Sequence, residues 1–230
     1  MLAIIDYDAG NIKSVEKAMQ LLGQQVVITR DKEVILNADK VILPGVGAFG
    51  DAMEKIRQYG LEEVIHQVVE KNIPFLGICL GLQLMFESSE ETPGVEGLGL
   101  LKGKIVKIPE NGELKIPHMG WNSLHFQNDG RLFANLPQDS YVYFVHSYYL
   151  QAEDESIVKA TTEYSTCIHA SVEKDNVMPV ATPSQIHTGK AYILTTLNGT
   201  QPQKYEIEIE KVNLTTSDPN KNMVIRILIY

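Results

Sequence analysis

Cys79 is the residue whose surroundings point most clearly to chemistry. It stands between Gly77 and Gly81, at the end of an apolar run and before a segment with helical spacing. A cysteine at such a sharp strand-to-helix turn has the arrangement of a nucleophile elbow, where flanking side chains would crowd a strained backbone. Free amides at a helix start favour thiolate, so we predict a lowered pKa and a thioester-forming nucleophile. The alternative is a small buried apolar residue, as most free cysteines are.

Two further segments have residue types suited to a site. Residues 44–47, Pro-Gly-Val-Gly, could present backbone amides to a developing oxyanion, although such a turn also simply ends a strand. Residues 143–149 form an aromatic run around His146, a pattern more typical of a sheet core than of a site. Cys167 has no flanking glycines and is predicted to be structural.

Alternating strands and helices must position these residues. Apolar runs predict strands at 2–6, 25–29, 41–43 and 74–78. Helical spacing predicts helices at 11–22, 52–57, 61–71 and 80–87. This alternation is typical of an α/β fold, a mostly parallel sheet with helices on both faces. Beyond residue 100, short alternating strands are expected at 101–107, 123–126, 141–147, 157–163 and 168–174.

Composition excludes several classes of protein. The 230 residues carry 20 Lys+Arg and 29 Asp+Glu, and this net charge of −9 disfavours a nucleic-acid binder. No apolar run reaches the roughly 18 residues of a membrane span, no export signal is recognised, and two cysteines make no disulfide framework. We therefore expect a cytoplasmic protein that binds neither nucleic acid nor membranes, with no metal and no cofactor.

Charge and pattern change near Val177. Residues 1–177 carry 15 basic and 25 acidic residues, a net charge of −10, whereas residues 178–230 carry five basic and four acidic residues, a net charge of +1. The tail predicts a hairpin of strands 191–197 and 205–212 around an Asn198-Gly199 turn, and a last strand at 223–230. The chain is thus predicted to comprise an α/β domain at 1–177 and a β-rich tail of different origin at 178–230.

Five segments together resemble the glutaminase subunits of imidazole glycerol phosphate synthase, a family of class I glutamine amidotransferases. They are DYDAGN at 6–11, LPGVGAFG at 43–50, GICLGLQ at 77–83, PHMGWN at 117–122 and YFVHSY at 143–148. The resemblance covers residues 1–177 and implies a flavodoxin-like fold that hydrolyses glutamine to glutamate and ammonia in histidine biosynthesis. It also implies a heterodimer with a (β/α)8-barrel cyclase that receives the ammonia. The tail is similar to a non-catalytic stretch of the sporulation stage IV B peptidase family.

The resemblance assigns roles to individual residues. It makes Cys79 the nucleophile. The positions that supply oxyanion donors match Val46, Gly47 and Leu80. The positions that hold the substrate glutamine match Gln83, Glu91, Ser147 and Tyr148. The positions that face the partner match Asn11, Trp121 and Tyr143.

The family's catalytic base and its acid lie in a Gln-Phe-His-Pro-Glu-Lys-Ser segment that this sequence lacks. After Val177 the chain reads MPVATPSQIHTGK, in which His187 is the nearest candidate base; the alternative is an exposed loop histidine. We expect glutamine hydrolysis through Cys79, with a catalytically inactive cyclase-binding protein as the alternative. A further alternative is that the tail prevents stable folding, because it leaves a sheet edge exposed.

Overall fold

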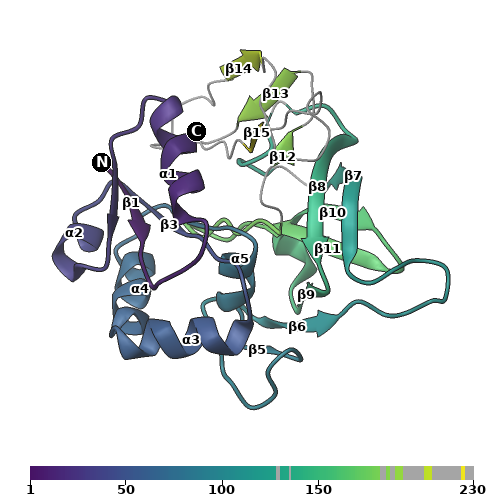
Figure 1. Cartoon of the computed structure of the whole chain (residues 1–230), viewed down its shortest axis with the longest axis horizontal. Coiled ribbons are helices and arrows are strands. Elements are labelled where there is room, and N and C mark those ends of the chain that lie inside the picture. The colour runs from purple at the N-terminus through teal and green to yellow at the C-terminus, as the bar shows by residue number, and fades with distance from the viewer. Residues whose placement is uncertain are drawn as a thin grey trace, which may run out of the picture.

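A parallel sheet forms the first half of the molecule. The computed structural model describes residues 1–127, 130–134 and 136–181, and four short strands beyond them. Strands β1 (Leu2–Ile5), β2 (Val26–Thr29), β3 (Lys40–Leu43) and β4 (Phe75–Gly77) pair in parallel in the order β2-β1-β3-β4. Figure 1 labels β1 and β3 of this sheet, which lie near the N-terminus. All four strands expected for this sheet are present, and their order is the one of flavodoxin-like folds.

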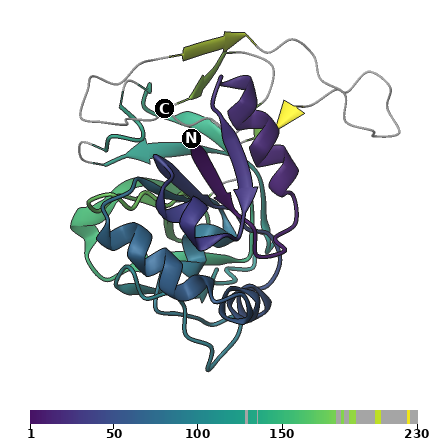
Figure 2. The same ribbon diagram turned by 90° about the vertical axis from the view of Figure 1, so that its left-hand side faces the viewer.

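Helices cover both faces of this sheet, as predicted. They are α1 (Ile12–Leu21), α2 (Lys32–Leu36), α3 (Phe49–Gln58), α4 (Leu61–Glu70) and α5 (Leu80–Leu84). Successive strand residues point to opposite faces. Leu2 and Ile4 therefore pack with α1, whereas Ala3 and Ile5 pack with α2, α3 and α4. Figure 2 shows α1 on the opposite side of the strands from α3 and α4. The short α2 was not predicted, and α5 ends before residue 87, where the sequence had extended it.

The second sheet is almost entirely antiparallel. Its seven strands are β5 (Ser88–Ser89), β6 (Gly103–Lys107), β7 (His118–Phe126), β8 (Ser140–His146), β9 (Tyr148–Ala152), β10 (Val158–Glu163) and β11 (Cys167–Val172). They pair in the order β5-β6-β9-β11-β10-β7-β8, and only β5 and β6 run parallel. The five strands expected beyond residue 100 are confirmed. The extra strand β9 was missed because Ser147 interrupts the aromatic run.

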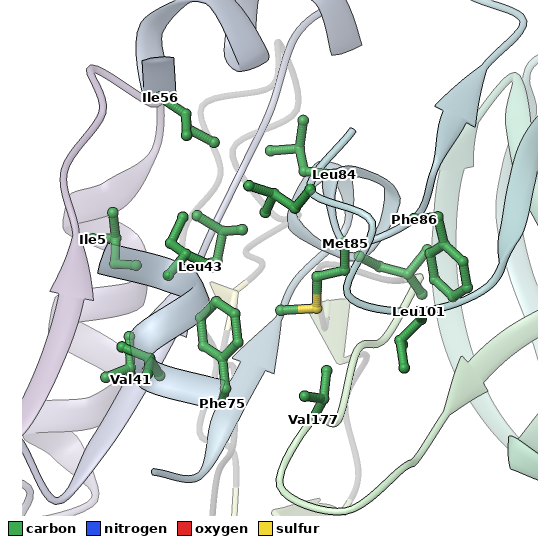
Figure 3. Packing of buried hydrophobic residues seen from close by; sticks show 14 of the residues in the cluster. Ile5, Val41, Leu43, Ile56, Phe75, Leu84, Met85, Phe86, Leu101 and Val177 are labelled. Carbon is green, nitrogen blue, oxygen red and sulfur yellow. The ribbon is translucent and has the colours of Figure 1, made fainter. Parts of the chain in front are cut away.

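The segment 176–180 joins the two sheets. Phe75 N donates to Asn176 O at 2.8 Å and Val180 N donates to Gly77 O at 2.8 Å, so the segment runs parallel to β4. On its other side Val180 forms an antiparallel bridge with Ser171 of β11. Val177 points into the main apolar cluster beside Phe75 (Figure 3). Strand β4, which leads to Cys79, is therefore an internal strand with a partner on each side.

Four short strands are described beyond residue 181. They are β12 (Gln185–Ile186), β13 (Lys190–Ile193), β14 (Tyr205–Glu208) and β15 (Val224–Ile225). Antiparallel pairing of β13 with β14 confirms the predicted hairpin partners, and β12 pairs with β15. The expected Asn198-Gly199 turn lies outside the described residues. In the described part of the chain, no helix is long and apolar enough to cross a membrane.

Candidate active site

Cys79 occupies a strained turn between β4 and α5. Its backbone has φ 56° and ψ −111°, a combination that residues other than glycine rarely adopt. A Cβ on Gly77 would stand 2.8 Å from Gly81 O, and one on Gly81 would stand 1.9 Å from Leu43 O. Both flanking positions therefore require glycine, which confirms the crowding predicted from the sequence.

The thiol of Cys79 is less acidic than the sequence had suggested. Burial raises its pKa from 9.0 to about 11, while the Leu80 amide that hydrogen-bonds the sulfur lowers it. The predicted lowering of the pKa was wrong. Removing the thiolate from water destabilises it by more than it is stabilised by one amide at the start of a five-residue helix. At neutral pH the group is a thiol, so attack on a substrate requires a base.

The turn 44–47 lies directly against the elbow. A Cβ on Gly45 would stand 2.8 Å from Leu80 Cβ and 3.1 Å from Gly81 N. Gly47 has φ 102°, a conformation that favours glycine, and Val46 is exposed. The structure thus brings the three residues matched to oxyanion donors, Val46, Gly47 and Leu80, to the same edge of the parallel sheet as the sulfur.

Two residues matched to substrate binding meet where the sheets adjoin. Gln83 on α5 directs its Nε2 towards Tyr148 O, 3.5 Å away at the start of β9. Ser147 precedes Tyr148, and the backbone carbonyl of Ser147 accepts a hydrogen bond from Ile108 N at 2.9 Å. Helix α5, which begins after Cys79, is therefore in contact with the antiparallel sheet.

Glu91 has a structural partner that the sequence did not reveal. Its Oε2 accepts from Phe49 N at 2.8 Å, and Thr92 Oγ1 accepts from Gly50 N at 3.2 Å. These contacts satisfy free amides in the first turn of α3, because Ala48 at the helix start offers no side-chain acceptor. The partners lie 42 residues apart in the sequence, so no local pattern could have indicated them.

A buried pair of histidines leads to the same carbonyl of Tyr148. His118 Nδ1 lies 3.1 Å from His146 Nε2, and His146 Nδ1 lies 3.0 Å from Tyr148 O. A carbonyl only accepts, so His146 donates from Nδ1 and accepts from His118. Burial, and then His146, lowers the pKa of His118 to about 4, which keeps this ring neutral. The sequence analysis predicted His146 to lie in the sheet core and did not identify His118 as its partner. The two residues lie opposite each other in the pairing of β7 with β8, and this register is what would have indicated their contact.

Trp121 and Tyr143, matched to the partner side, are opposite each other on β7 and β8. Their ring centroids lie 5.5 Å apart in an edge-on arrangement. Met119 and Val145 occupy the next positions on the same face and are 60% and 41% exposed. This face is apolar and open to solvent. Asn11 lies elsewhere, exposed at the start of α1.

The candidate base, His187, lies outside the described residues. The described chain passes beside Cys79 at Val180, where Cys79 N donates to Val180 O at 2.9 Å. Four of the five described histidines have other hydrogen-bonding partners: His118, His125, His146 and His169. Within the part that the structure describes, no cluster of side chains could hold a metal ion. Cys167 is exposed on β11, far along the chain from the elbow.

Comparisons with known proteins define the class. The family described as glutamine amidotransferase class-I matches residues 3–187, and SpoIVB peptidase S55 matches the shorter stretch 156–229. A crystal structure titled glutamine amidotransferase superposes with a TM-score of 0.61 at 18% identity, over 78% of this chain and 88% of its own. PurLQS from Thermotoga maritima gives 0.58 at 20% identity, over 78% and 84%. The chain belongs to the class I glutamine amidotransferases and has their fold.

More similar relatives share one name. Imidazole glycerol phosphate synthase subunit HisH of Oceanobacillus iheyensis is 48% identical over 191 residues, which are 83% of this chain and 92% of that protein. A subunit HisH of Methanococcus maripaludis is 46% identical over 181 residues, 77% of this chain and 88% of its own. The chain belongs to this HisH family, the glutaminase subunits of imidazole glycerol phosphate synthase.

Proposed function

We propose that the protein hydrolyses glutamine to glutamate and ammonia through a thioester on Cys79. The observation that carries this proposal is the position of Cys79, at φ 56° between two obligatory glycines and with the Leu80 amide on its sulfur. This arrangement places a nucleophile at the end of a strand and offers a donor to the oxyanion that forms beside it.

The reaction has two covalent steps. A base removes the thiol proton, the sulfur attacks the amide carbon of glutamine, and the C–N bond breaks as the proton passes to the leaving ammonia. Water then attacks the thioester, releasing glutamate and restoring the thiol. With the pKa of the thiol near 11, the base is indispensable, and His187 is the residue that we propose for this role.

The substrate and the partner complete the proposal. Gln83, Glu91, Ser147 and Tyr148 hold the glutamine. A cyclase with a (β/α)8-barrel fold docks against the face of Trp121 and Tyr143 and also contacts Asn11. The two proteins form a cytoplasmic heterodimer that acts as a lyase in histidine biosynthesis. No nucleic acid and no membrane take part. Residues 178–230 are a segment of different origin appended to the glutaminase domain at 1–177.

Glutamate production tests the function directly. The intact chain is assayed with the cyclase subunit and an analogue of its substrate present, next to the variants Cys79→Ala and His187→Ala. We expect turnover in the wild type and none in either variant. His125→Gln is the matched control, because this exposed histidine pairs with Asp139 at 2.8 Å and lies on another sheet.

The outcomes separate the two catalytic roles from the alternative. Turnover that survives His187→Ala would remove His187 as the base while leaving Cys79 in place. A wild type that binds the cyclase but releases no glutamate would establish the inactive binding protein instead.

A further inference from the structure

Tyr7 is a buried polar residue that the proposed mechanism does not use. It lies in the loop between β1 and α1 and is only 2% exposed. Its hydroxyl donates to Pro44 O at 2.7 Å. Pro44 follows β3 directly and begins the turn 44–47, so this hydrogen bond ties the loop after one strand to the turn after its neighbour.

The Tyr7 hydroxyl also lies within the packing of the elbow. A Cβ on Gly45 would stand 2.5 Å from Tyr7 Oη and 2.8 Å from Leu80 Cβ, so the turn is held between the hydroxyl and the start of α5. Burial, and then the nearby Cys79, raises the pKa of Tyr7. The hydroxyl therefore stays protonated and remains a donor throughout the pH range of the protein.

The loop that carries Tyr7 is fixed on both sides of it. Arg30 donates to Asp6 at 2.8 Å and to Asp8 at 2.8 Å, and its guanidinium lies 4.1 Å from the centre of the Tyr59 ring. The Tyr59 hydroxyl donates to Asp8 as well. These contacts hold the backbone before and after Tyr7, so the position of its hydroxyl is set by the fold rather than by the turn that it contacts.

We propose that Tyr7 is a positioning residue that fixes the oxyanion turn 44–47 against Cys79. By holding Pro44 O, the hydroxyl sets the plane of the peptide that leads into Gly45 and so the orientation of the amides that follow. It does not touch the substrate and transfers no proton. The proposal rests on the proposed glutaminase function only for its kinetic consequence, since the hydrogen bond from Tyr7 to Pro44 O exists without substrate or partner.

The test is Tyr7→Phe, which keeps the buried ring and removes the hydroxyl. The amide NMR signals of Val46 and Gly47 should shift or broaden relative to the wild type, because the peptides that follow Pro44 lose their fixed orientation when the hydrogen bond to Pro44 O is lost. In the glutaminase assay kcat should fall about tenfold while KM stays within twofold, because the turn acts on the oxyanion and not on bound glutamine. A purely structural role would lower the melting temperature without this separation of kcat from KM.

Tyr164→Phe is the matched control, because that hydroxyl also donates to a backbone carbonyl, Lys115 O, at 2.7 Å. It should change neither the amide signals of Val46 and Gly47 nor kcat. The proposal is overturned if Tyr7→Phe leaves these signals as they are in the wild type. If the wild type itself releases no glutamate, the proposed function fails, and the NMR comparison still decides the role of Tyr7.

Discussion

The two sheets build their parts of the site from different materials. The parallel sheet contributes backbone: a positive φ at Cys79, a glycine at 77 that leaves room for Gly81 O, a glycine at 81 that leaves room for Leu43 O, and a glycine turn. The antiparallel sheet contributes side chains and the carbonyl that they hold, through His118, His146 and Tyr148. The first part is set by close approach of main chains, and the second by pairs of side chains brought together by strand register.

This difference predicts how each part responds to change. Where main chains are in contact, one added methyl group has no room and the fold must move. Where two neutral imidazoles connect β7, β8 and β9 through hydrogen bonds, protonation or substitution should lower the stability gradually. Three experiments test this contrast, beginning with the one for which we expect the largest effect.

Gly81→Ala should be the most damaging substitution. Its Cβ would stand 1.9 Å from Leu43 O, a backbone atom that cannot rotate away. We expect the free energy of unfolding to fall by about 3 kcal/mol or more, measured by urea denaturation. Gly23→Ala is the control. A Cβ at this position would have nothing within 4 Å, while φ is 72°. This variant therefore reports the free-energy cost of the backbone conformation alone, about 1–2 kcal/mol. Equal losses in the two variants would contradict the importance of close approach at the elbow.

The histidine pair should make the antiparallel side sensitive to acid. The pKa of His118 is about 4 in the folded chain and 6.5 in an ordinary histidine, so between these values the unfolded chain binds the proton more tightly. Stability is therefore complete above pH 6.5 and is lost as the pH falls towards 4. Between pH 7 and pH 5 the wild type should lose about 2 kcal/mol more than His118→Phe, which keeps the ring stack with Phe144 and Tyr164.

The control for this measurement is His125→Gln at an exposed position. It should follow the pH profile of the wild type. If His118→Phe also follows that profile, the buried pair is not the source of the acid sensitivity.

The outer face of β7 and β8 should give the smallest effect. Trp121→Ala removes one of two rings that lie edge-on, next to the exposed Met119 and Val145. Affinity for the cyclase subunit, measured by calorimetry, should fall about tenfold, roughly 1.4 kcal/mol. Leu21→Ala on α1, at a residue 67% exposed, should leave affinity unchanged. An unaffected affinity in Trp121→Ala would place the partner on another face.

Much of the parallel sheet could be predicted because its signals are local. Continuous apolar runs marked β1, β3 and β4, and the spacing of Val15, Ala18 and Met19 marked α1. The five-residue α2 has too few turns to show a period. Strand β9 was hidden because Ser147 divides one aromatic run into two strands, a division that only pairing with β6 reveals.

The sequence by itself determined the sharp turn at Cys79 and the need for glycine around it, since such a turn imposes its requirements on adjacent residues. Tertiary structure decided the pKa of Cys79, the cap that Glu91 gives to α3, and the hold of Tyr7 on Pro44. Each of these depends on groups that are distant in the chain and adjacent in space. Burial and long-range hydrogen bonds arise only when the sheets assemble, so no local pattern contains them.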